Sequence, residues 1–292
     1  MSAFDNAAPA FGAYTYDELV KQYDASSTVP STDPYFAEYA ARSERSRTEL
    51  ACELDVVYGS HERERVDFFP ALQPDSPLFF FVHGGYWRRL DKSFFSFVAT
   101  TVVRAGGAAA IVNYPLAPTA TLDQIVSSVR NAFAFTLGNA ARLNADARRV
   151  VAGGHSAGGQ LTGMIAATDW SAYGVPADCL TGIFPISGLF DLHPVRLSHV
   201  NEWMAMDEAV AERNSAQRLI PKRNIRLIAS VGGAESDEFR RQSLEYVHAW
   251  EAAGHSATYL APPGHNHFSI PLALADATTP LAREMLKLLE LS

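Results

Sequence analysis

Short strand-like segments alternate with helix-like segments from about residue 50 to the end of the chain. Residues 78–82 (Leu-Phe-Phe-Phe-Val) are apolar without interruption. Such a run is typical of a strand that is covered on both faces of a parallel sheet. Strands that alternate with helices at this spacing form parallel βαβ units. We therefore predict an α/β fold with an open, mostly parallel, doubly wound sheet flanked by helices.

The predicted strands are short segments of mainly apolar residues, bounded by residues that favour turns. They cover residues 51–58, 64–69, 78–82, 108–114, 149–152, 181–186, 225–231 and 257–260. The first two are expected to form a hairpin around Gly59-Ser60. Helices are predicted at residues 94–104, 121–139, 161–168, 237–253 and 281–289. Ligands of such sheets bind beyond the carboxyl ends of the strands, so the loops that follow the strands are where functional residues are expected.

Two further segments lie outside this alternation. Residues 1–50 form a helical lead-in, with a capping box from Thr15 to Glu18 and a second helix that opens at Asp33-Pro34 and runs to about Arg47. Residues 193–222 are long for one connection, and we expect a small helical cap insertion over the site. The whole chain, residues 1–292, is expected to form a single domain.

Composition excludes several classes of protein. Hydrophobic residues make up 48% of the chain and charged residues 19%, which excludes a disordered chain. The net charge of −8 and the lack of a basic cluster argue against nucleic acid or an anionic membrane as partner. Cys52 and Cys179 are too few for a disulfide framework or a four-thiolate zinc site. The first residues do not resemble a signal peptide and no apolar stretch approaches the length of a membrane span, so we expect a soluble cytoplasmic protein.

The pentapeptide 154–158 (Gly-His-Ser-Ala-Gly) follows an apolar strand and opens an Ala/Leu-rich helix. A serine on a strand-to-helix turn needs strained backbone angles, and small neighbours allow that turn to close. The helix N-terminus then favours negative charge developing beside the hydroxyl. We predict that Ser156 is a nucleophile. A phosphate-binding loop is excluded because no Gly-Lys-Ser/Thr follows.

A second glycine pair, Gly84-Gly85, comes directly after the Phe-rich strand. Attack by a serine places negative charge on the former carbonyl oxygen, which needs rigid donors. The N–H of Ala157 can supply one donor, and the N–H groups of Gly84, Gly85 or Tyr86 can supply others. His83 is expected to orient this loop rather than to act as the base.

A serine nucleophile also requires a base. In this fold the histidine follows the last strand, and His265 and His267 occupy that loop. The context Asn266-His267-Phe268 favours His267. A metal pair of His265 and His267 lacks a third ligand, so no metal or other cofactor is expected.

The acid must bond the imidazole Nδ1–H, and it should follow the strand that ends at Val231. Glu235 lies just past a Gly-Gly turn and is favoured. Asp237 and Glu238 suit the first turn of the next helix, where acids complement the dipole. Asp237 nevertheless stays a rival.

These residues resemble the serine-dependent arylformamidase (kynurenine formamidase) branch of the α/β-hydrolases, close to the hormone-sensitive-lipase-type esterases. The resemblance covers roughly residues 50–270 and rests on the segments 83–87, 113–118, 154–159, 186–192, 235–243 and 266–268. It implies an α/β-hydrolase fold with Ser156 as nucleophile, Glu235 as acid and His267 as base. The family often has aspartate at the acid position, so the glutamate is a departure that keeps Asp237 as an alternative.

The activity implied by the resemblance is hydrolysis of N-formyl-L-kynurenine to L-kynurenine and formate, in tryptophan catabolism. Two alternatives stay open: a carboxylesterase for short-chain or aryl esters, and a non-catalytic small-molecule-binding protein of the same fold. Tyr86, Trp87 and Phe190 are candidates for an aromatic substrate wall. We expect a small-molecule substrate as the main partner, with a homodimer as an open alternative to the monomer.

Overall fold

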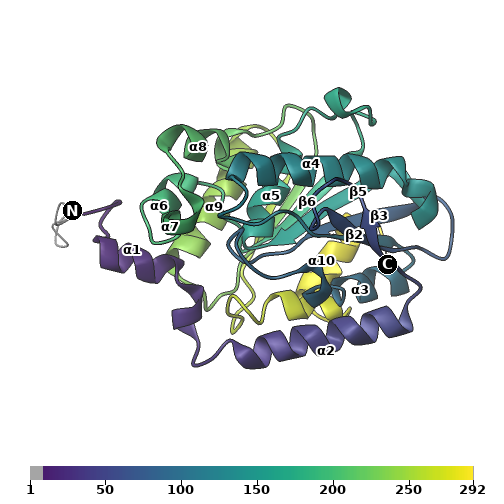
Figure 1. Ribbon diagram of the computed structural model, residues 1–292, viewed down its shortest axis with the longest axis horizontal. Helices are drawn as coiled ribbons and strands as arrows, with labels where there is room; N and C mark the ends of the chain where they lie inside the picture. The colour runs from purple at the N-terminus through teal and green to yellow at the C-terminus, as the bar shows by residue number, and fades with distance from the viewer. Residues whose placement is uncertain (1–8, 292) are drawn as a thin grey trace.

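The computed structural model describes residues 9–291 and contains one eight-stranded sheet (Figure 1). The strand order is β1-β2-β4-β3-β5-β6-β7-β8. The strands are β1 (Glu53–Val57), β2 (Arg65–Phe69), β3 (Ser76–Val82), β4 (Ala108–Val112), β5 (Ala145–His155), β6 (Leu180–Ile186), β7 (Arg226–Ser230) and β8 (Ala257–Leu260). Only β2 runs antiparallel to its neighbours β1 and β4, and every other pairing is parallel. The predicted hairpin and the mostly parallel α/β sheet are therefore confirmed.

Strand β3 explains why the sheet needs helices on both faces. Its alternate side chains enter two separate cores: Phe80 belongs to one, whereas Phe79 and Phe81 belong to the other. The helices α4 (Leu122–Gly138), α5 (Ala157–Ala166) and α9 (Asp237–Ala252) cover the first face. The helices α2 (Asp33–Glu49), α3 (Val98–Arg104) and α10 (Pro280–Leu288) cover the second. Figure 1 shows α4 and α5 above the sheet and α2, α3 and α10 below it.

Strand β5 is longer than the predicted 149–152 at both ends, since it begins at Ala145 and continues through Gly153 and Gly154 to His155. A Cβ on Gly153 would lie 2.5 Å from the Phe79 ring, and one on Gly154 would lie 2.3 Å from the carbonyl oxygen of Gly158. These glycines therefore serve close packing inside the strand. Helix α5 begins directly after Ser156, so the chain turns from strand to helix within one residue.

The lead-in contains the two predicted helices, with the short 3₁₀ helix η1 (Ala25–Thr28) between them. Helix α1 (Tyr16–Tyr23) has the expected capping box between Thr15 and Glu18. Helix α2 begins at Asp33, which is its first helical residue and not its N-cap; the Asp33 N–H donates to Ser31 Oγ at 3.1 Å. Between β6 and β7, the chain forms the short helices α6 (Leu192–Arg196), α7 (Asn201–Met204) and α8 (Glu208–Arg213). In the part of the chain that the structure describes, no helix combines the length and the apolar character that a membrane crossing needs.

A buried ion pair fixes the end of the loop that follows β3. The Lys92 ammonium lies 2.7 Å from Asp67 and 2.7 Å from Asp55. The Lys92 and Asp67 side chains are 5% and 1% exposed, whereas that of Asp55 is 71% exposed. The backbone N–H of Lys92 also donates to Asn113 Oδ1 at 2.9 Å.

We predict that Lys92→Met lowers the free energy of unfolding by about 3–5 kcal/mol, because it leaves the Asp67 carboxylate buried without its cation. Urea denaturation measures the change. The matched control is Lys287→Met, which removes an exposed lysine paired with Glu284 and should change stability by less than about 1 kcal/mol. Equal effects of the two substitutions would contradict the prediction.

Candidate active site

Ser156 occupies the sharp turn between β5 and α5. Its backbone angles, φ 58° and ψ −120°, lie outside the regions that a residue with a side chain ordinarily adopts. The Ser156 N–H donates to the carbonyl of Ile186 on the neighbouring strand at 2.8 Å. Strain of this kind persists only where the surroundings hold it. The turn therefore presents the Ser156 hydroxyl at the carboxyl end of the sheet and at the N-terminus of α5.

Glu235 and His267 form a buried pair at the same end of the sheet. The His267 Nδ1 lies 2.6 Å from Glu235 Oε2, and both side chains are almost completely buried. Glu235 reaches the imidazole from the turn after β7, and His267 lies in the loop after β8. A carboxylate bonded to Nδ1 fixes the tautomer whose Nε2 can accept a proton.

The other carboxylate oxygen of Glu235 is held by two donors. Its Oε1 accepts from the Gly232 N–H at 2.7 Å and from the Ser187 hydroxyl at 2.5 Å. Asp237, the rival acid, begins α9, pairs with Arg240 and has a side chain 66% exposed. The structure therefore brings Glu235, and not Asp237, to the histidine. Sequence reasoning did not identify Ser187 as a supporting residue.

The His267 ring is held between two other rings. The His155 ring centroid lies 4.6 Å away and that of Phe239 lies 4.7 Å away. The loop itself is tied by Asn266, whose Oδ1 accepts from the N–H of Phe268 at 2.9 Å, and by Tyr39, whose hydroxyl donates to the Phe268 carbonyl at 2.6 Å. A helix from the lead-in thus fixes the loop that carries the histidine.

Ser156 and His267 line the same cavity. Within residues 9–291, no hydrogen bond joins the Ser156 hydroxyl to the imidazole. Catalytic hydrogen bonds are often long before substrate binds, and they tighten in the complex. The arrangement has the connectivity of a serine–histidine–acid triad, with the histidine–acid bond already formed.

The loop after β3 approaches the serine closely. A Cβ on Gly84 would lie 3.0 Å from the Ser156 Cβ and 2.7 Å from the His155 carbonyl oxygen. Among the described residues, the N–H groups of Gly84, Gly85, Tyr86 and Ala157 donate to no protein acceptor. These four residues are the ones predicted to supply an oxyanion hole, and the structure leaves their donors available beside Ser156.

Several bonds hold this loop in place. The Tyr114 hydroxyl donates to the His83 carbonyl at 2.9 Å, and Trp203 Nε1 donates to the Tyr86 carbonyl at 3.1 Å. The carbonyl of Trp87 accepts from the Ala117 N–H at 2.8 Å. Tyr86 and Trp87 both have positive φ, at 51° and 55°. The donors of the loop are therefore fixed before any substrate arrives.

His83 is buried beneath this loop. Its ring stacks on Tyr114 with centroids 4.4 Å apart, and its Nδ1 lies 2.7 Å from the Gly84 carbonyl. Burial lowers the pKa of His83 to about 4, so the ring is neutral at pH 7. Burial also lowers the pKa of His155, with a further contribution from His267. Neither group competes with His267 as a positive charge in the site.

The cavity around Ser156 has a volume of about 90 Å³, below the roughly 300–1,000 Å³ of sites that enclose a drug-sized ligand. Its wall includes seven aromatic rings, which come from Tyr23, Phe36, Tyr39, Tyr86, Phe95, Trp203 and Phe268. The lead-in contributes three of these rings and the segment of α7 contributes Trp203. Sequence reasoning had singled out Tyr86 alone among them, because aromatic residues give no periodic signal of which cavity they face.

Trp87 and Phe190, also predicted for the substrate wall, do not line this cavity. Trp87 is fully buried, and its Nε1 donates to Gln160 of α5 at 3.1 Å. Phe190 stacks on Tyr246 with centroids 4.0 Å apart. Both rings pack in the core behind the site, and this packing corrects the expectation that they contact the substrate.

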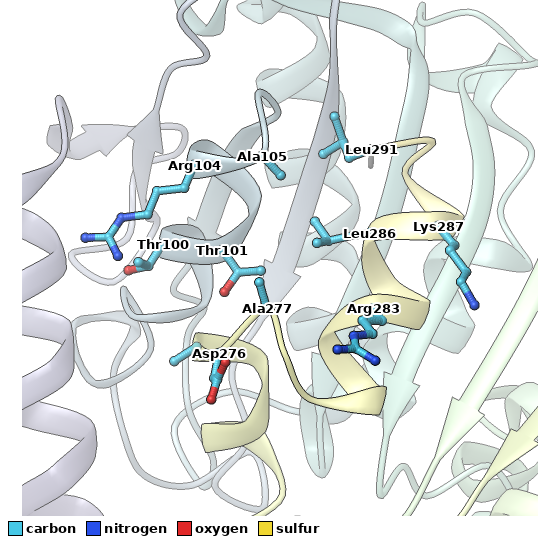
Figure 2. A pocket seen from close by; sticks show the side chains of 11 residues that line it. Thr100, Thr101, Arg104, Ala105, Asp276, Ala277, Arg283, Leu286, Lys287 and Leu291 are labelled. Atoms are coloured by element: carbon cyan, nitrogen blue, oxygen red, sulfur yellow. The ribbon is translucent and has the colours of Figure 1, made fainter.

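A wider hollow lies elsewhere, between α3 and α10 (Figure 2). It has a volume of about 650 Å³ and is lined by side chains such as Thr100, Arg104, Arg283 and Lys287. None of its lining residues is a serine, cysteine or histidine. The larger hollow therefore lacks the combination of a serine and a histidine that lines the smaller cavity.

No group of three histidine, cysteine, aspartate or glutamate side chains is arranged to hold a metal ion within residues 9–291. His265, the other member of the predicted alternative pair, has its Nδ1 3.4 Å from the Ser269 hydroxyl. Its carbonyl accepts from the Ala234 N–H at 2.9 Å, which joins the loop of the base to the loop of the acid.

The chain is similar in sequence and in fold to several known proteins. Residues 68–177 match the BD-FAE family. The chain is 33% identical to a kynurenine formamidase of Danio rerio over 94% of its own length and 96% of the relative, and 33% identical to one of Salmo salar over the same shares. A Silicibacter protein provisionally described as a thioesterase superposes with a TM-score of 0.80 at 30% identity, covering 91% of this chain and 98% of the other. Esterase B of Lactobacillus rhamnosus superposes with a TM-score of 0.68 at 15% identity, covering 91% and 95%.

We predict that Glu235→Gln lowers kcat by about 10³- to 10⁴-fold, because an amide at this position no longer stabilises the imidazolium or selects the tautomer of His267. Steady-state kinetics measure the loss. Asp237→Asn is the matched control and should retain most of the activity, because Asp237 contacts Arg240 and not the histidine. A larger loss from Asp237→Asn would assign the acid to Asp237.

We also predict that Gly84→Ala lowers kcat by at least about tenfold, because the added methyl must displace either the Ser156 turn or the donor loop. Gly138→Ala is the control, since a Cβ there meets no atom within 4 Å. The thermal unfolding midpoint of each variant separates loss of function from loss of fold. Wild-type kcat in a folded Gly84→Ala variant would show that this loop does not contribute to catalysis.

Proposed function

The chain belongs to the kynurenine formamidase family of α/β-hydrolases, and we propose that it hydrolyses N-formyl-L-kynurenine to L-kynurenine and formate. The family relationship spans nearly the whole length of the chain and of its relatives. The observation that carries the proposal is the bonded Glu235–His267 pair in the same aromatic cavity as the strained Ser156. An aromatic wall suits a substrate whose scissile bond is attached to an aryl ring.

The proposed reaction begins with Ser156 and His267. The imidazole Nε2 accepts the proton of the Ser156 hydroxyl as the oxygen attacks the formyl carbon. The resulting oxyanion accepts hydrogen bonds from N–H groups of Gly84, Gly85, Tyr86 and Ala157. One such donor is typically worth about 3 kcal/mol in the transition state. Glu235 stabilises the imidazolium that forms and keeps its own negative charge.

The tetrahedral intermediate then breaks at its C–N bond. His267 donates its proton to the departing aryl nitrogen, which leaves as the amine of kynurenine, and the formyl group stays on Ser156 as an ester. A water molecule gives a proton to His267 and attacks this ester, and formate leaves as the serine recovers its proton. An aryl amine is a better leaving group than an alkyl amine. The catalytic groups of an esterase are therefore sufficient to cleave an aryl formamide.

A carboxylesterase with small acyl preference is the second candidate. It is supported by the fold shared with esterase B. The ratio of kcat/KM for N-formyl-L-kynurenine to kcat/KM for short p-nitrophenyl esters separates the two. A formamidase should favour the amide despite its poorer leaving group, whereas an esterase should favour the activated ester.

A non-catalytic binding protein of the same fold is the third candidate. It would require the loss of a triad member, and Ser156, Glu235 and His267 are all present and gathered at one end of the sheet. Labelling of Ser156 by a fluorophosphonate probe supports the enzyme, and absence of labelling supports the binder. A cytoplasmic location and a homodimer stay predictions; light scattering at micromolar concentration tests the homodimer.

We predict that Ser156→Ala abolishes turnover of N-formyl-L-kynurenine and of p-nitrophenyl acetate alike, because both reactions need the same nucleophile. The amine product and p-nitrophenol are each followed by absorbance. Ser127→Ala, at an exposed position of α4, is the control and should keep wild-type rates. Full retention of either activity in Ser156→Ala would remove this serine from the mechanism.

A further inference from the structure

The proposed substrate carries two charges away from its scissile bond. N-formyl-L-kynurenine is an α-amino acid, so at pH 7 its α-carbon carries one ammonium and one carboxylate. The side chain joins this α-carbon to the aryl ketone, whose ring bears the formamide. Moving both charges from water into an aromatic cavity is costly unless each meets a complementary group. A cavity adapted to this substrate should therefore present one negatively charged and one positively charged side chain on its wall.

The cavity wall contains one carboxylate and one guanidinium. Asp24 is its acidic side chain and Arg89 is its arginine. In the part of the chain that the structure describes, neither forms an ion pair with another side chain, although ion pairs are common elsewhere on the molecule. An exposed arginine and a half-buried aspartate that share a cavity, and that have no ion-pair partner among the described residues, are suited to a ligand with both charges.

Both groups are attached to the loop that carries the oxyanion donors. The Tyr86 hydroxyl donates to the carbonyl of Tyr23, the residue before Asp24. The Asp24 Oδ1 accepts from the Ser26 N–H at 3.2 Å, which fixes the carboxylate at the end of α1. The Arg89 N–H donates to the Gly85 carbonyl at 3.1 Å. Asp24 and Arg89 are thus positioned by contacts with the same loop, residues 84–89, that lies beside Ser156.

The pKa of the Tyr86 phenol reports the proximity of both charges. Burial raises this pKa most, the Asp24 carboxylate raises it further, and the Arg89 guanidinium lowers it. His199 also lines the cavity, and burial lowers its pKa, so it is mainly neutral at pH 7 and does not replace Arg89 as a cation. Its Nδ1 is buried without a partner among the described residues.

We propose that Asp24 and Arg89 form an amino-acid recognition subsite, in which Asp24 binds the α-ammonium and Arg89 binds the α-carboxylate of the substrate. This proposal rests on the proposed function and adds to it the residues that select a zwitterionic aryl formamide over an uncharged aryl ester. An arginine can hold a carboxylate through two parallel N–H···O bonds, which also fixes its orientation. The lead-in helix α1 thereby acquires a direct role in specificity.

The experiment compares variants with matched substrates. The substrates are N-formyl-L-kynurenine, its analogue without the amino group, its analogue without the carboxylate, and p-nitrophenyl acetate. Asp24→Asn should lower kcat/KM for N-formyl-L-kynurenine, relative to p-nitrophenyl acetate, by about tenfold through KM, and it should cause no such loss with the analogue that lacks the amino group. Arg89→Gln should show the same pattern with the analogue that lacks the carboxylate, and a smaller loss because Arg89 is exposed.

Two controls carry the same charge changes outside the cavity. Asp17→Asn changes an exposed acid of α1, and Arg45→Gln changes an exposed arginine of α2. Both should leave the substrate ratio unchanged. Equal losses with the charged substrate and its matched analogue, or equal losses in the controls, would overturn the subsite.

Failure of the proposed function gives a different result from failure of the subsite. If the wild-type enzyme hydrolyses p-nitrophenyl acetate but not N-formyl-L-kynurenine, the proposed function is wrong and the subsite loses its ligand. If the wild type hydrolyses N-formyl-L-kynurenine efficiently and Asp24→Asn and Arg89→Gln do so with an unchanged substrate ratio, only the subsite is wrong.

Discussion

The site depends on how closely the turn at Ser156 approaches the end of β3. A Cβ on Gly158 would lie 2.0 Å from the Val82 carbonyl oxygen, and a Cβ on Gly84 would lie 3.0 Å from the Ser156 Cβ. Two backbone segments therefore meet where the predicted nucleophile and the predicted oxyanion donors would contact the same carbonyl group of a substrate. The glycines permit this contact, and the two buried cores on either face of β3 and β5 hold the strained turn in place.

The lead-in is part of the site although it precedes the sheet in the sequence. Helix α1 ends at the cavity and is tied to α9 by the Tyr23 hydroxyl, which donates to Glu238 at 2.7 Å. Helix α2 contacts the loop of the base through Tyr39 and through Tyr35, whose hydroxyl accepts from Asn266 at 2.8 Å. Residues near the start of the chain thus position a histidine near its end. The lead-in therefore stabilises both the fold and the loop that carries His267.

Sequence reasoning identified the residues whose roles follow from local pattern. The Gly-x-Ser-x-Gly turn, the histidine after the last strand and the glycine loop after β3 depend on position along the chain, and the structure gathers them as expected. The choice between Glu235 and Asp237 depends on which carboxylate the backbone turns toward His267, and only coordinates reveal that bond. The cavity wall was largely missed, because contacts such as that between Trp203 and the Tyr86 carbonyl join segments far apart in sequence.

In the proposed function, the chemistry and the selectivity come from different parts of the fold. Ser156, Glu235 and His267 lie in loops of the sheet, in an arrangement equally able to cleave an ester or an aryl amide. The charged and aromatic wall comes from the lead-in, from the loop after β3 and from the insertion that carries Trp203. Substrate choice must then arise from these added segments, because differential binding of remote groups is what separates substrates that share one reaction centre. Changes in the lead-in should therefore alter which substrate is favoured while the reaction itself stays the same.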